Sequence, residues 1–211
     1  LLLLNNGIFY EFIPMDEFGN EDSEAIPLED VKTGVTYAMI ISSNSGLWRY
    51  DIGDTVQFTS LDPYRIKISG RTKQFINAFG EEVMVGNTDK AIAITSKQTE
   101  SVVGEYTVAP VYLKSDSRGC HEWVIEFKKA PQNMSEFANI LDQNLQKLNS
   151  DYQAKRTADL ALTELKITPV HEGVFHEWMK SRGKLGGQNK VPRLSMERKY
   201  VEEILRFVSQ N

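Results

Sequence analysis

Two short blocks of the sequence hold residue types that could bind a nucleotide. Residues 49–54 read Arg-Tyr-Asp-Ile-Gly-Asp, and residues 69–73 read Ser-Gly-Arg-Thr-Lys. In the first block a glycine allows a tight backbone turn, so that Asp54 can accept hydrogen bonds from two adjacent hydroxyls, as on ribose. In the second block Arg71 offers a planar fork of N–H donors to ribose or phosphate oxygens. Side chains of this kind on neighbouring strand ends suit a nucleotide.

A third block, residues 183–193, is rich in glycine and basic residues but lacks the Gly-x4-Gly-Lys-Ser/Thr pattern of a P-loop. A lysine on such a loop could neutralise charge on a phosphate under attack. Each block also has a simpler explanation when it is read separately. Gly-Asp is common in plain turns, an arginine at a strand end can be merely solvated, and a glycine-rich loop can be an exposed flexible linker.

The remaining reactive residue types do not form a recognisable centre. His121, His171 and His176 have no metal-ligand spacing, so we expect structural or surface histidines and predict no metal site. The single Cys120 excludes an internal disulfide, is expected to be inert, and fits a reducing compartment. The adjacent Glu81 and Glu82 are expected to be a solvated pair, and the three tryptophans are expected in the core.

Composition limits the class of protein and of partner. The chain has 211 residues, of which 41% are hydrophobic and 25% charged, as is typical of a soluble globular protein with one large or two small domains. Its net charge of −5 provides no attraction to nucleic acid or to an anionic membrane surface. No apolar run is long enough for a membrane span.

Residues 1–71 are expected to be mainly β. Residues 1–4 and 8–13 flank an Asn-Gly pair and predict a hairpin, and the acidic segment 14–27 predicts an exposed loop. Further apolar or alternating runs predict strands at 36–42, 55–60 and 64–69, the last two joined by a turn at Asp62-Pro63.

From residue 72 onward the pattern predicts an α+β module, with a domain boundary and hinge at Gly70–Lys73. The fold class expected for the chain is therefore α+β, divided into residues 1–71 and 72–211. The expected elements are a helix at 88–97 capped by Asn87 or Thr88, strands at 106–113 and 121–127, a helix capped by Ser135 with an apolar stripe reaching Tyr152, a strand at 160–170, a short helix at 175–182 and a last helix capped by Ser195.

Taken together and in order, these blocks resemble the adenylate-forming superfamily of acyl ligases. The matching stretches are Gly7–Pro14, Ser45–Asp54, Gly70–Lys73 and Gln188–Arg193, and the resemblance covers essentially the whole chain. The Tyr-x-x-Gly-Asp and Gly-Arg blocks are typical of the superfamily. The Glu-Phe-Ile-Pro and Gln-x-Lys-x-Pro-Arg blocks resemble, more narrowly, the plant auxin-responsive family of acyl-acid amido synthetases and its bacterial relatives.

The resemblance implies a cytoplasmic enzyme that activates a small carboxylic acid with ATP and Mg²⁺, giving an acyl-adenylate and pyrophosphate. An amino acid then attacks the mixed anhydride to form an amide. Two alternatives remain open: an acyl-CoA ligase, in which CoA is the acceptor, and a non-catalytic α+β binding module. Neither nucleic acid nor a membrane is expected as a partner.

The resemblance also implies that residues 1–71 are the C-terminal, β-rich part of a large adenylation, or AMP-binding, domain. In that domain Asp54 would hold the ribose hydroxyls, Arg71 would contact ribose or the α-phosphate, and Tyr50 belongs to the same nucleotide-binding block. The family's phosphate loop and a Tyr-x-Ser-Ser-Glu-like block should precede Leu1. We therefore expect a C-terminal piece of a longer ligase that is inactive without the missing N-terminal part.

Residues 72–211 would be the mobile C-terminal domain. Lys73 would lie at the hinge about which this domain rotates between the two half-reactions. Lys190 would be the lysine that stabilises charge on the phosphates, and Lys184 is the alternative for that role, since a Gly-Lys pair also occurs near this point in related ligases.

Overall fold

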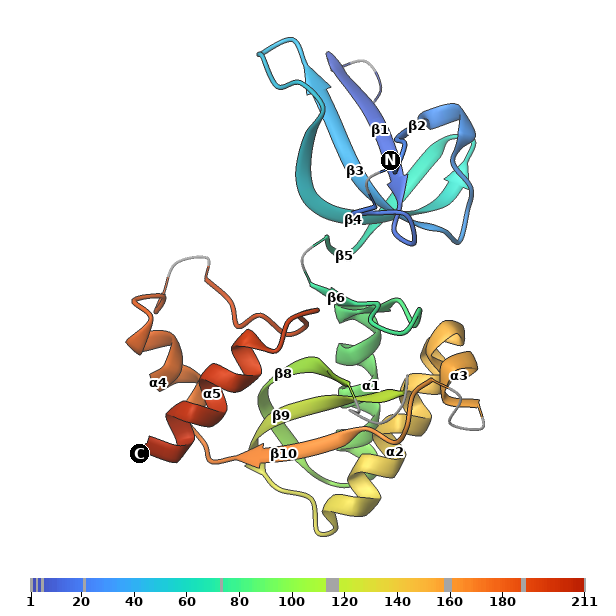
Figure 1. The fold of residues 1–211 in the computed structure, drawn as a ribbon. Coiled ribbons are helices and arrows are strands. Elements are labelled where there is room, and N and C mark those ends of the chain that lie inside the picture. The colour runs from blue at the N-terminus through green and yellow to red at the C-terminus, as the bar shows by residue number, and fades with distance from the viewer. Residues whose placement is uncertain are drawn as a thin grey trace. The chain divides into compact units, whose positions relative to one another are not determined.

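The computed structural model describes residues 2, 4, 6–20, 22–72, 74–112, 118–157, 161–186 and 189–210. The chain folds into two compact units, Leu1–Lys73 and Gln74–Asn211. Each unit has its own sheet and its own hydrophobic core (Figure 1). The first unit is almost entirely β and the second mixes strands with helices, so the α+β class is confirmed.

The first unit is a five-stranded antiparallel sheet in the order β2-β1-β3-β4-β5. Its core is a cluster of aromatic rings packed edge to face, with ring centroids 5.1 Å apart for Phe12 and Phe58. The elements are β1 Ile8–Pro14, β2 Ile26–Pro27, the 3-10 turn η1 Leu28–Asp30, β3 Thr36–Ser43, β4 Tyr50–Leu61 and β5 Tyr64–Arg71.

The predicted N-terminal hairpin is wrong for the residues that can be judged. Leu2 and Leu4 belong to no strand, and the backbone N–H of Leu2 donates to the carbonyl of Tyr64 at 2.9 Å. Strand β1 pairs instead with β3, and this pairing brings Phe12 and Tyr37 into the same aromatic core. The other residues of that prediction, Leu1, Leu3 and Asn5, lie outside the described range.

Strand β4 is longer than its sequence predicts. It starts at Tyr50 rather than Thr55, so the block 49–54 is mostly strand and not a tight turn between strands. Register shifts interrupt the pairing of β4 with both of its neighbours. The alternation expected along β5 fails at Ile68, which is 71% exposed and is the last residue in register before one of these shifts.

The second unit has three layers. The central sheet is β8 Val102–Tyr112, antiparallel to β9 Gly119–Lys129, which is parallel to β10 Lys166–Val170. Helices α1 Val85–Gln98, α2 Met134–Leu148 and α3 Ser150–Arg156 pack on one face, and α4 Val174–Ser181 and α5 Lys199–Gln210 on the other (Figure 1). The short strands β6 Phe75–Ile76 and β7 Val83–Met84 pair with each other.

Alternation along β9 explains why both faces of this sheet are covered. Trp123, Ile125 and Phe127 point into the core beneath α1 and α2, as their spacing predicts. Val124 lies on the opposite face, where it joins the cluster formed by α4 and α5. A strand that is apolar on both faces must be covered on both sides.

The predicted starts of three helices need correction. Helix α1 begins at Val85, so Thr88 lies inside it and is buried. Asn133, rather than Ser135, caps α2, with its side chain accepting a hydrogen bond from the backbone N–H of Glu136. The last helix begins at residue 199, after the segment that contains the predicted cap Ser195.

Two further elements differ from the sequence prediction, because a short break in a helix or strand changes the hydrophobic periodicity very little. The apolar stripe expected to run through Tyr152 is divided between α2 and α3 by Asn149, which has an extended backbone and caps α3. The strand predicted at 160–170 is only β10, and residues 158–160 lie outside the described range.

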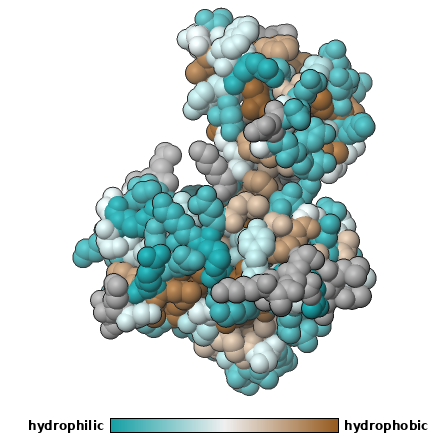
Figure 2. Space-filling view, in the orientation of Figure 1, coloured by the Kyte–Doolittle hydropathy of each residue, from teal (hydrophilic) through white to brown (hydrophobic). Residues whose placement is uncertain are grey.

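The visible surface of both units is largely hydrophilic, with hydrophobic residues in smaller patches (Figure 2). Among the described residues, no helix has the length and apolar character needed to cross a membrane.

Candidate functional site

Asp54 and Arg71 lie directly opposite each other where β4 pairs with β5. The Nε atom of Arg71 is 2.8 Å from Oδ1 of Asp54, and their side chains are 62% and 28% exposed. Because β5 is the edge strand of the sheet, the pair lies at the rim of the first unit and is open to solvent. The structure thus brings together two residues that the sequence proposed as ligand-binding partners.

Strand β4 has a bulge around Gly53, next to Asp54, where its pairing with β3 is irregular. Gly53 has a φ of +77°, in the left-handed region that favours glycine. Its N–H donates to Oδ1 of Asp51 at 2.7 Å, and its carbonyl accepts a hydrogen bond from the N–H of Thr72 at 3.0 Å. The glycine is therefore needed for a bulge within a strand and not for a turn between strands.

We predict that Gly53→Ala destabilises the first unit by about 1–2 kcal/mol, because a Cβ is strained in the left-handed conformation. Gly53→Asn should lose less, since asparagine tolerates this conformation better. Hydrogen exchange of the β4 and β5 amides measures the effect. Equal protection in Gly53→Ala and the unsubstituted chain would show that the bulge does not need glycine.

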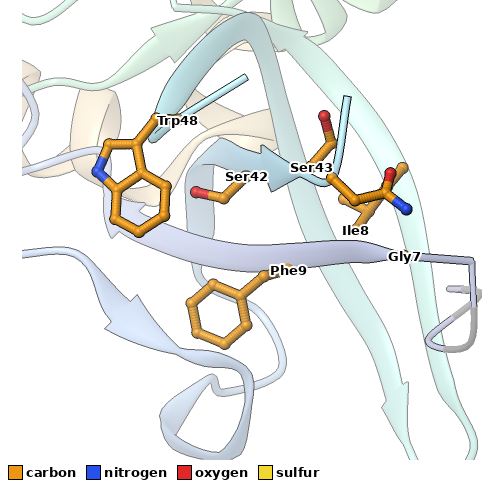
Figure 3. A pocket seen from close by; sticks show the side chains of 7 residues that line it. Gly7, Ile8, Phe9, Ser42, Ser43 and Trp48 are labelled. Atoms are coloured by element: carbon orange, nitrogen blue, oxygen red, sulfur yellow. The ribbon is translucent and has the colours of Figure 1, made fainter. Parts of the chain in front are cut away.

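Tyr50 lies four positions before Asp54, at the start of β4, and takes no part in the ion pair. Near this end of the sheet is a hollow of about 360 Å³. Figure 3 shows the rings of Phe9 and Trp48 toward one end of it, with Gly7, Ile8 and Ser43 toward the other. The hollow offers aromatic faces and serine hydroxyls to a ligand.

Trp48 contradicts the expectation that every tryptophan belongs to the core. Its side chain is 84% exposed, whereas Trp123 and Trp178 are buried as expected. Trp48 follows the turn after β3, and no strand neighbour covers its ring. The Ser45-Gly46 pair just before it was the available signal that this residue follows a turn.

The two candidate lysines belong to the second unit, and both side chains are exposed. Lys184 lies three positions after the end of α4, and its backbone N–H donates to the carbonyl of Met179 in the last turn of the helix. Lys190 lies six positions further on, in the irregular segment before α5. The predicted hinge residue Lys73, and Gln188 of the motif around Lys190, lie outside the described range.

The basic loop is not a flexible linker along its whole length. Its last residues run beside β8, where the N–H of Val108 donates to the carbonyl of Arg193 at 2.8 Å and the N–H of Ser195 donates to the carbonyl of Val108 at 3.1 Å. Leu194 is fully buried. The segment after Lys190 is therefore hydrogen-bonded to β8 and runs as a short strand-like segment along the edge of the sheet.

Glu81 corrects the expectation of a solvated carboxylate pair. Its side chain is completely buried, and its Oε1 is 2.8 Å from Nε2 of the equally buried His121. Its other oxygen accepts a hydrogen bond from the N–H of Phe79 at 2.6 Å. Burial raises the pKa of Glu81, but the hydrogen bond and charge of His121 and the Phe79 N–H outweigh burial, so the pKa is lowered overall.

Stability should therefore fall in acid. A carboxyl group whose folded pKa lies below its ordinary value of 4.5 stabilises the fold above that pH and loses this contribution as the pH falls through the folded pKa. Urea unfolding of the 211-residue chain, followed by fluorescence of the buried Trp123 and Trp178, should show a decreasing midpoint below about pH 4.5.

Glu81→Gln should flatten this acid dependence, while Glu136→Gln, an exposed substitution on α2, should leave it unchanged. The same slope in Glu81→Gln and in the unsubstituted chain would refute the assignment to Glu81.

Other reactive groups are structural. Cys120 is buried, and burial followed by the nearby Glu122 carboxylate raises its pKa, which keeps the thiol protonated and unreactive. In the described part of the chain no three His, Cys, Asp or Glu side chains are grouped to hold a metal ion.

Comparison with known families assigns both units. The GH3 family central domain matches residues 1–71, and the GH3 family C-terminal domain matches residues 86–199.

Two curated relatives from Arabidopsis thaliana align over most of the chain. The indole-3-acetic acid-amido synthetase GH3.3 is 28% identical over 205 residues, which cover 90% of this chain and 34% of the relative. The 4-substituted benzoates-glutamate ligase GH3.12 is 27% identical over 210 residues, which cover 89% of this chain and 35% of the relative. The chain thus spans about a third of the length of these relatives.

Among solved structures, a GH3.15 acyl acid amido synthetase matches with a TM-score of 0.67 and 22% identity, covering 97% of this chain and 36% of that protein. At this identity the match shows that the two share a fold.

Proposed function

This chain belongs to the GH3 family, and from that premise we propose that the full-length protein is an ATP-dependent acyl-acid amido synthetase. The two Arabidopsis relatives are an indole-3-acetic acid-amido synthetase and a 4-substituted benzoates-glutamate ligase. We accordingly propose a small carboxylic acid and an amino acid as substrates. A cytoplasmic location fits the free, buried Cys120.

The observation that carries the proposal is the Asp54–Arg71 pair at the rim of the first unit. A carboxylate is an acceptor for both hydroxyls of a ribose, and a guanidinium is a fork of donors for the neighbouring phosphate. The pair offers both groups from directly opposite positions on adjacent strands, at a solvent-accessible edge of the sheet. We assign Asp54 to the ribose hydroxyls, Arg71 to ribose or the α-phosphate, and Tyr50 to the same nucleotide site.

The proposed reaction has two steps. In the first, an oxygen of the substrate carboxylate attacks the α-phosphorus of ATP, the bond from that phosphorus to the bridging oxygen breaks, and pyrophosphate leaves. In the second, the amine nitrogen attacks the acyl carbon, AMP leaves with the former carboxylate oxygen, and the nitrogen loses a proton. Neither step requires a nucleophile from the protein, so positioning and charge stabilisation are the main demands.

We assign charge stabilisation in the first step to Lys190, with Lys184 as the alternative. Both side chains are exposed and are available to a phosphate. Residues 72–211 would then act as a mobile domain that turns about Lys73 between the two steps, because two different reactions in one pocket call for two arrangements of groups.

Mg²⁺ accompanies ATP in the proposed reaction. In the described part of the chain no three His, Cys, Asp or Glu side chains are grouped to hold a metal ion. We assign no magnesium ligand to this chain.

The decisive experiment uses the full-length protein with ATP and a panel of carboxylic acids, including indole and benzoate acids. Acid-dependent exchange of labelled pyrophosphate into ATP is expected. Mass spectrometry after addition of either amino acids or CoA identifies the acceptor, and an amide is expected. A CoA thioester would instead indicate an acyl-CoA ligase. Absence of exchange and of AMP binding by calorimetry would indicate a non-catalytic module.

A further inference from the structure

We propose that Arg193 is a positioning residue, held between Asp89 and Glu105, that fixes the backbone of Lys190 for the adenylation step. This inference rests on the role proposed above for Lys190. Arg193 lies three positions after that lysine in the sequence, and all the contacts that carry the argument lie within the second unit.

Three groups contact the guanidinium of Arg193: two carboxylates at its edges and an aromatic ring on one face. Its Nη1 is 2.6 Å from Oδ1 of Asp89 on α1, and its Nε is 3.2 Å from Oε1 of Glu105 on β8. Its central carbon lies 5.2 Å from the ring centre of Tyr106. Burial would lower the pKa of Arg193, but Glu105, Tyr106 and Asp89 together raise it, so the group stays charged. Two carboxylates and a ring fix a planar cation in position and in orientation.

The backbone next to this side chain is equally restrained. Val108 donates to the carbonyl of Arg193, and the hydroxyl of Thr107 donates to the carbonyl of Pro192 at 2.7 Å. The next residue, Leu194, has no exposed surface. Residues 192–195 therefore follow the edge of β8 closely.

This anchor is close enough to Lys190 to limit its position. Three residues span at most about 10 Å of extended chain. Pro192 has a fixed φ, and it restricts Val191 to extended conformations. Val191 also packs against the core that α4 and α5 form with the sheet. On the other side of Lys190, Gly186 has a positive φ, and its carbonyl accepts one hydrogen bond, from the side chain of Asn189 at 3.3 Å. Lys190 thus lies where a glycine-rich stretch meets an anchored one.

The surroundings of Arg193 indicate why its removal should disturb the position of Lys190. Beside the guanidinium is an open hollow of about 390 Å³, lined by residues of α1 and β8 that include Ile92, Ser96 and Val103. Truncation at position 193 would therefore enlarge a space open to solvent. It would also remove the cation between the two carboxylates, leaving Asp89 with the hydroxyl of Tyr106 and Glu105 with the backbone N–H of Tyr106. The carboxylates of Asp89 and Glu105 would repel each other, which favours detachment of the segment.

A double-mutant cycle in the full-length protein tests this. Arg193→Ala should lower kcat for pyrophosphate exchange by about 10–100-fold, the scale for a misplaced group, and leave KM for ATP within about threefold. Combined with Lys190→Ala, it should cause no further loss. Arg193→Lys should recover part of the rate, since it keeps the charge but not the planar fork. Arg206→Ala, at an exposed arginine of α5 that pairs with Glu202, is the matched control and should have no effect.

The outcomes separate this inference from the proposed function. If Lys190→Ala is impaired but Arg193→Ala is not, the positioning role is overturned and the function stands. If Arg193→Ala lowers the rate equally with and without Lys190, it acts independently of the lysine and the inference is again overturned. If Lys190→Ala retains full exchange, both assignments are wrong. If circular dichroism shows that Arg193→Ala does not fold, Asp89→Asn takes its place. This substitution removes the charge from the shorter of the two contacts of Arg193, and its exchange rate is compared with and without Lys190→Ala.

Discussion

Replacing Lys190 by alanine in the full-length protein is expected to lower the rate of acyl-adenylate formation by at least ~100-fold, the scale for losing one preorganised charge-stabilising group. Negative charge builds up on the phosphates as pyrophosphate leaves, and an ammonium group is a compact cation that can offset it. The motivating observation is an exposed lysine held next to an anchored segment of the second unit. Acid-dependent pyrophosphate exchange measures this step directly.

Two further variants make this prediction selective. Lys184→Ala decides between the two candidate lysines, and we expect it to retain most of the exchange activity. Lys180→Ala removes another exposed lysine, on α4, and should have no effect. A pattern in which Lys184→Ala is severely impaired and Lys190→Ala is not would transfer the role to Lys184. Near wild-type exchange in both would remove charge stabilisation from this loop altogether.

The second large effect is expected at Asp54. Asp54→Ala should lower adenylation by at least ~100-fold, because the ribose hydroxyls lose their shared acceptor in a site that depends on positioning. The substitution also leaves Arg71 without its ion-pair partner. Asp54→Asn keeps the shape and one acceptor oxygen, so it should be less impaired. Calorimetry with AMP, alongside pyrophosphate exchange, separates a loss of nucleotide binding from a loss of rate.

The control for Asp54 is Asp62→Ala, in the turn at the other end of the β4–β5 pair. This variant should bind AMP and catalyse exchange normally. Unchanged AMP affinity and exchange in Asp54→Ala would rule out Asp54 as the ribose ligand. Retained hydrogen-exchange protection of β4 and β5 in the variant is required, so that a loss of activity is not a loss of the sheet.

Features that depend on local spacing could be predicted from the order of the residues. Alternation placed Trp123, Ile125 and Phe127 on one face of β9, and the apolar stripe starting at Phe137 predicted α2, because the side-chain periods of strand and helix are written directly in the residue order. The ordered motifs around Asp54, Arg71 and Lys190 were sufficient to indicate the family, which the comparison of both units confirmed.

Features that depend on partners far away in the sequence became visible only in the folded chain. Glu81 meets His121 across 40 positions, and Arg193 meets Asp89 across 104 positions. No local pattern distinguishes these groups from solvated charges, since burial of a charge is tolerated only where the fold supplies its counterpart. The bulge at Gly53 and the exposure of Trp48 likewise follow from how β3, β4 and β5 align, because strand register is a property of neighbouring strands and not of one segment.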